Sequence, residues 1–106
     1  MPMFPPSWVN EAEIASGVKR AEAALAPDVV RIRYSLADDW TGDPSIFYRV
    51  VLSDAVAARE EELGETAQRV REAVWSEVDA EQYGRHDYFN FRSLSEQAEL
   101  KDPKWE

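Results

Sequence analysis

The sequence predicts a two-layer α+β fold with the element order α-β-β-α-β. Apolar residues recur at helical spacing in two segments, and three shorter segments are rich in β-branched and aromatic residues. The chain has 106 residues, of which 44% are hydrophobic and 11% aromatic, enough for one small domain with its own core. We expect a three-stranded mixed sheet packed on two helices.

The first nine residues are expected to form an extended arm, because three prolines occur within them. Asn10 and Glu13 resemble a capping box at the start of a first helix over residues 11–26, which Pro27 ends. The apolar face of this helix recurs at intervals of three and four residues, at Ile14, Val18, Ala21 and Leu25.

Residues 29–36 and 45–53 have the composition of two strands. The segment between them, residues 37–44, contains turn-forming residues and predicts a β-hairpin with a long loop. Ser53 or Asp54 then caps a second helix that runs to Val78, and Gly64 is the place where we expect it to bend or divide.

Residues 88–92 predict a third short strand. The single α+β domain is expected to cover residues 10–94, followed by an acidic tail over residues 95–106, with one or two helical turns in residues 93–100. A second helix between strands two and three can act as a right-handed crossover, which would make these two strands parallel.

This order of elements resembles that of type II KH domains and of other small split βαβ folds. The resemblance covers element order alone. The GxxG loop of nucleic-acid-binding KH domains is missing, because Gly64 is followed by Glu65, Thr66 and Ala67.

Alternation along the strands divides the sheet into two predicted faces. The face toward the helices takes Val30, Ile32, Tyr34, Leu36, Ile46, Tyr48, Val50, Leu52, Phe89 and Phe91. The opposite face takes Arg31, Arg33, Ser35, Phe47, Arg49, Val51, Tyr88, Asn90 and Arg92. Four arginines and two aromatic residues thus gather on one face without a carboxylate among them.

Three interpretations of this face stay open. It is a solvated side of the sheet, an interface with a second copy or another protein, or a site for an anionic ligand or RNA. The candidate binding residues are Arg31, Arg33, Phe47, Arg49, Tyr88 and Arg92, with Trp40 in the hairpin loop. The acidic residues of the tail could also fold back onto the arginines: Glu96, Glu99, Asp102 and Glu106.

The formal net charge of −9 opposes binding to a phosphate backbone. The absence of cysteine excludes disulfides, thiolate nucleophiles and cysteine-ligated zinc. The N-terminus has no basic region followed by an apolar stretch, and no apolar run has membrane-spanning length, so we expect a cytoplasmic protein without a membrane partner.

Catalytic and cofactor motifs are weak. Asp38, Asp39 and Asp43 could hold a hard cation, but their spacing matches no EF-hand and suits a turn. His86 and Asp87 are adjacent, so in a strand they point to opposite sides. The four glycines are isolated and form no phosphate-binding loop. We expect no catalytic residue, no metal and no cofactor.

The leading hypothesis is therefore a non-enzymatic interaction protein that forms a homodimer or binds another protein, for example as a small acidic inhibitor of the antitoxin or immunity type. The alternative is an RNA- or ribosome-associated KH-like domain that uses the arginine face. A metal-dependent enzyme built on the aspartate loop ranks third.

Overall fold

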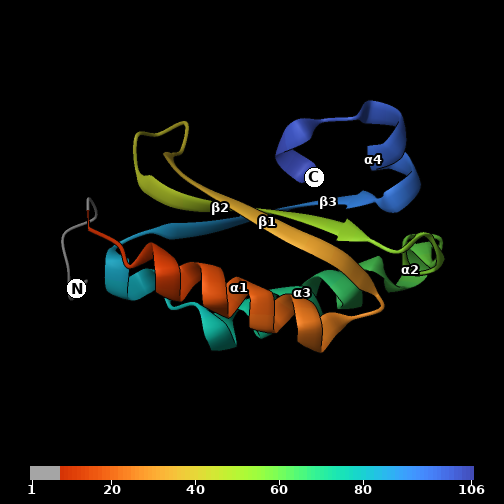
Figure 1. The fold of residues 1–106 in the computed structure, drawn as a ribbon, viewed down its shortest axis with the longest axis horizontal. Helices are drawn as coiled ribbons and strands as arrows, with labels where there is room; N and C mark the ends of the chain where they lie inside the picture. The colour runs from red at the N-terminus through yellow and green to blue at the C-terminus, as the bar shows by residue number, and fades with distance from the viewer. Residues whose placement is uncertain (1–7) are drawn as a thin grey trace.

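The computed structural model describes residues 8–106 and confirms the α+β fold (Figure 1). The sheet has the strand order β1-β2-β3, with β1 antiparallel and β3 parallel to the central strand β2. The longer elements are α1 (Glu11–Leu25), β1 (Val29–Asp38), β2 (Pro44–Leu52), α2 (Asp54–Ala57), α3 (Leu63–Glu77), β3 (His86–Ser93) and α4 (Leu94–Leu100). Three short 3-10 helices are η1 (Glu60–Glu62), η2 (Ala80–Tyr83) and η3 (Pro103–Trp105).

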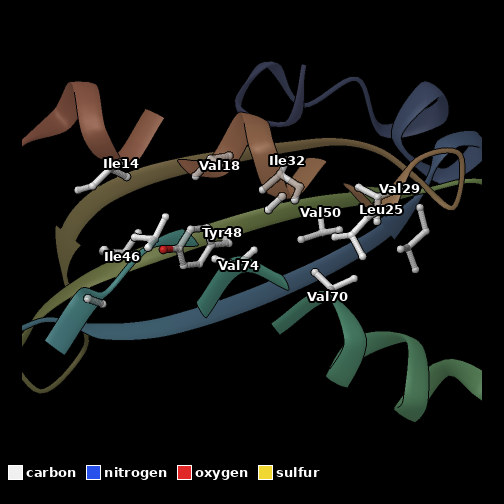
Figure 2. Close-up of a cluster of buried hydrophobic side chains, with 14 of the residues drawn as sticks. Ile14, Val18, Leu25, Val29, Ile32, Ile46, Tyr48, Val50, Val70 and Val74 are labelled. Atoms are coloured by element: carbon white, nitrogen blue, oxygen red, sulfur yellow. The ribbon is translucent and has the colours of Figure 1, made fainter. Parts of the chain in front are cut away.

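Helices α1 and α3 lie on one face of the sheet and enclose the core (Figures 1 and 2). The apolar stripe of α1 is buried as its spacing predicts, and on α3 the buried residues include Val70 and Val74. The two helices approach closely at Gly17, where a Cβ atom would lie 2.7 Å from the backbone oxygen of Glu77. Glycine is required there because any side chain would push α1 away from α3.

Residues 53–78 do not form one helix divided at Gly64. Ser53 caps α2 through a hydrogen bond from the backbone N–H of Val56 to its hydroxyl oxygen, but α2 has only four residues. The chain then turns through η1 before α3 begins at Leu63. The break therefore precedes Gly64, which lies in the first turn of α3.

The hairpin is more regular than the sequence predicts. β1 and β2 pair as far as Asp38 opposite Pro44, which leaves only residues 39–43 in the loop. At the other end the register shifts between Val29 and Arg31. Because of this irregularity Val29 is buried and Val30 is 37% exposed, so the prediction that Val30 faces the helices is wrong.

The third strand is longer than the predicted residues 88–92, and its parallel pairing with β2 confirms the crossover through α3. The resemblance of this order to KH domains stays a prediction.

Residues 94–106 add a layer on the opposite side of the sheet from α1 and α3 (Figure 1). A capping box between Ser93 and Glu96 starts α4, and Lys101 ends it in a left-handed conformation. The chain then turns back so that η3 contacts β1 and β2. The segment that the composition suggests as a charged tail is packed against the sheet, with Trp105 only 6% exposed.

Candidate functional site: the outer face of the sheet

We call the side of the sheet away from α1 and α3 the outer face. The strand register arranges its side chains in four rows across β1, β2 and β3. From the hairpin loop toward the end of β3 the rows are Ala37–Ser45–His86, Ser35–Phe47–Tyr88, Arg33–Arg49–Asn90 and Arg31–Val51–Arg92. The pairing thus brings together the predicted site residues of all three strands.

The row Arg31–Val51–Arg92 lies beneath the C-terminal segment, and we call it the covered half. The guanidinium of Arg92 lies 4.1 Å from the centre of the Trp105 ring, a cation–π distance. Arg31 donates a hydrogen bond of 2.9 Å from Nε to the backbone oxygen of Trp105. Val51 between them is fully buried. This half of the predicted site is therefore occupied by the chain itself.

Acidic groups of the same segment pair with these arginines. A carboxylate oxygen of Asp102 lies 3.6 Å from Arg92 Nη1, and one of Glu106 lies 3.8 Å from Arg31 Nη2. Two of the four acidic residues suggested for this contact make it, whereas Glu96 is used in the cap of α4.

Gln97 holds the covered half together from α4. Its amide oxygen accepts a hydrogen bond of 2.9 Å from Arg92, and its amide nitrogen donates to the backbone oxygen of Asp102 and to the carboxylate of Glu106. The side chain is buried, so these bonds satisfy polar atoms that would otherwise be costly to remove from water.

The two remaining arginines differ from each other. Arg33 donates from Nε to the backbone oxygen of Glu106, and its Nη1 lies 3.6 Å from a carboxylate oxygen of Glu22 on α1. Arg49 is half-buried, and among residues 8–106 no carboxylate forms a salt bridge with it. Within the described residues, Arg49 therefore keeps a charge without a salt-bridge partner at the centre of the outer face.

The row Ser35–Phe47–Tyr88 continues into the hairpin loop, and we call Trp40, Phe47, Arg49 and Tyr88 the open half. Phe47 and Tyr88 stack with ring centres 5.3 Å apart. Trp40 contacts Tyr88 from the loop at 5.2 Å, yet 79% of it is exposed. An exposed indole held against a second aromatic ring offers a defined apolar surface to a partner.

Asp39 fixes the loop that carries Trp40. One carboxylate oxygen accepts from the hydroxyl of Thr41 and from the backbone N–H groups of Thr41 and Asp43, and the other accepts from the hydroxyl of Tyr88 at 2.7 Å. These hydrogen bonds, that of the Thr41 hydroxyl first, hold the pKa of Asp39 well below its usual range. The same bond to Asp39 raises the pKa of Tyr88.

The aspartates of the loop thus have structural partners. Asp43 lies 3.4 Å from Nε2 of His86, with both side chains mostly exposed. Within the part of the chain that the structure describes, no group of three or more acidic or histidine side chains is placed to hold a metal ion.

Asp87 points to the opposite side from His86, into the helix side of the sheet. Burial raises its pKa to about 6, although the side chains of Tyr48 and Trp75 favour the ionised form. Burial and the charge of Asp87 in turn raise the pKa of Tyr48. This pair is separated from the candidate site by the sheet.

The bond between Asp39 and Tyr88 could have been found from the sequence only in part. Asp39 followed two residues later by Thr41 is a typical signal for a side-chain-supported turn. The link from this turn to a residue 49 positions away depends on the strand register. Sequence reasoning also missed Gln97, whose polar side chain gives no indication that it is buried.

Comparison of this chain with known protein families, with curated proteins and with solved structures finds no match. The helices described in residues 8–106 include none that is long and apolar enough to cross a membrane.

Proposed function

We propose that this protein is a non-enzymatic binding module that captures a partner protein through the open half of the outer sheet face. The observation that carries the proposal is Trp40, which is 79% exposed and yet held in place. Its ring rests on Tyr88, and Tyr88 is hydrogen-bonded to the carboxylate that closes the loop.

An aromatic side chain ordered before binding loses little conformational freedom when it enters a partner. Tryptophan, tyrosine and arginine are also the residue types that dominate binding energy at protein interfaces. Arg49 lies one row from Phe47 and Tyr88 and has no carboxylate partner within residues 8–106. The partner therefore offers an apolar recess for Trp40 and a carboxylate for Arg49.

RNA binding is the second candidate, and the positions of the arginines weigh against it. Arg31, Arg33 and Arg92 are engaged by acceptors within residues 8–106, so of the four arginines on the outer face Arg49 is the one left to contact phosphate, in a chain of net charge −9. RNA would have to displace the C-terminal segment to reach the others.

The test is affinity capture from an extract of the native cells at low and high salt. The wild-type protein is compared with a Trp40→Ala, Arg49→Glu double variant and with Leu100→Ala, which alters an exposed apolar residue on α4. We expect one stoichiometric protein to be retained at high salt by the wild type and by Leu100→Ala, and lost by the double variant.

With that partner purified, we expect Trp40→Ala alone to weaken binding at least about 30-fold, the size of an interface hot spot. Equal retention by the double variant, or retention of no protein, would contradict the proposal. RNA that is retained at low salt and released at high salt would replace it with the second candidate.

A further inference from the structure

The two edges of the sheet are protected differently. At the β1 edge, Glu22 on α1 accepts a hydrogen bond of 2.8 Å from the backbone N–H of Ile32. At the β3 edge, no side chain or loop group within residues 8–106 bonds to the backbone between His86 and Arg92. An unblocked strand edge is a template for a further strand.

An apolar groove of about 360 Å³ runs beside this edge, between β3 and α3. Its walls include Leu52, Leu63, Ala67, Arg71, Phe89 and Phe91. A second hollow of about 260 Å³ shares Leu52, Leu63 and Phe91 with it and extends it toward α4. On α3 the wall residues continue at four-residue intervals to Trp75, with Leu63 36% and Trp75 46% exposed.

We propose that a second copy of this chain occupies this edge, by antiparallel pairing of β3 with β3 around a two-fold axis at Asn90. The pairing would join the two sheets into one of six strands. In this register Phe89 of each copy lies opposite Phe91 of the other, so apolar side chains meet on the helix side.

The helix layer fits the same axis. Leu63 lies near Phe91 and Trp75 near Phe89, so α3 runs in the opposite direction to β3. The guanidinium of Arg71 lies 6.0 Å from both phenylalanine rings, which places the middle of the α3 stripe level with Asn90. A two-fold axis there brings Leu63 of one copy toward Trp75 of the other. The same axis therefore pairs the two β3 strands and packs the two α3 helices against each other.

The charge distribution favours a second copy at this surface. Each chain carries a net charge of −9, so two copies repel each other over most of their surface. Among the described residues, the groove has Arg71 as its one charged lining residue, and the adjoining hollow adds Arg92 and Glu96. This edge therefore lacks the excess of carboxylates that the whole chain carries. The like charges that meet at the axis are the two Arg71 guanidinium groups, each lying over the phenylalanine rings of its own copy.

A cysteine cross-link tests the register directly, because the chain contains no cysteine. Directly opposed residues of an antiparallel pair have Cα atoms about 4.5–5.5 Å apart, within the range of a disulfide. We expect the Asn90→Cys variant to form a disulfide-linked dimer on mild oxidation. The Lys19→Cys variant, altered at an exposed position on α1, serves as the control and is expected to stay monomeric.

Light scattering on the unmodified protein measures the association itself. We expect a dimer whose dissociation constant rises at least tenfold in Leu63→Lys, which places a charge in the groove, and is unchanged in Trp40→Ala. Because salt screens the repulsion between the acidic chains, raising the salt concentration should strengthen the dimer.

A monomer throughout the micromolar range, or equal cross-linking of the two cysteine variants, would overturn this inference. A dimer that Trp40→Ala breaks and Leu63→Lys does not would place the second copy on the open half instead. The inference is independent of the proposed function, since partner capture depends on Trp40 and dimerisation on the groove.

Discussion

The two halves of the outer sheet face share strands β2 and β3 and the same alternation of side chains, but they have different surroundings. On the covered half, Trp105 packs over Arg92 and is 6% exposed. On the open half, Trp40 packs against Tyr88 and is 79% exposed. The sequence does not distinguish these two tryptophans by exposure, yet in the structure one is buried and the other is exposed.

The difference shows why a patch of arginines in a sequence does not identify a binding site. Arg31 and Arg92 form salt bridges with carboxylates that follow them by at least ten residues along the chain, whereas Arg49 forms none within the part of the chain that the structure describes. The acidic C-terminal segment neutralises the charges of Arg31 and Arg92 and leaves the open half uncovered.

The largest expected effect separates the two tryptophans. Trp105→Ala should lower the free energy of unfolding by about 3 kcal/mol, because a buried aromatic ring is lost and Arg92 loses its cover. Trp40→Ala should change it by less than about 0.5 kcal/mol, since the ring is exposed. Urea unfolding of both variants checks this, and equal effects would show that the halves do not differ in packing.

A smaller effect compares the outer face with the helix side, where burial raises the pKa of Asp87 to about 6. The folded state then holds a proton that the unfolded state releases near pH 4, so stability falls as the pH rises from about 4 to about 6. Asp87→Asn cannot ionise and should avoid this loss.

We expect the Asp87→Asn variant to be more stable than the wild type by about 1–2 kcal/mol at pH 7.5, after allowance for the solvent that reaches this carboxyl group. At pH 4 the two proteins should unfold at the same urea concentration. A constant difference at all pH values would contradict the assignment of the effect to ionisation.

The smallest effect concerns the open half alone. Tyr88→Phe removes the hydrogen bond to Asp39 and should lower stability by less than half as much as Trp105→Ala. Because the pKa of Asp39 is depressed in the folded state, its stabilising contribution is complete above about pH 4 and is lost as the pH falls further. The difference between Tyr88→Phe and the wild type should shrink in the same range, as measured by thermal unfolding.

Local patterns in the sequence predicted most of the elements. Helical spacing predicts the buried stripe of α1, which consists of Ile14, Val18, Ala21 and Leu25. Alternation predicts the two faces of β2. The predictions that failed concern positions where tertiary contacts compete with local preference. Val30 is displaced by the register shift beside it, and residues 58–62 break the helix before Gly64.

The sequence by itself determined the fold class and which apolar segments form the core. It also determined that the candidate site residues lie on one face of the sheet. Both follow from helical and strand periodicity, which are local properties of the chain. Tertiary structure alone decided which of those residues remain available. The return of residues 94–106 onto the sheet, the burial of Gln97 and the bond between Tyr88 and Asp39 each join segments that lie apart in the sequence or in different elements. The free energy of each of these contacts depends on packing and desolvation, which a local sequence pattern does not predict.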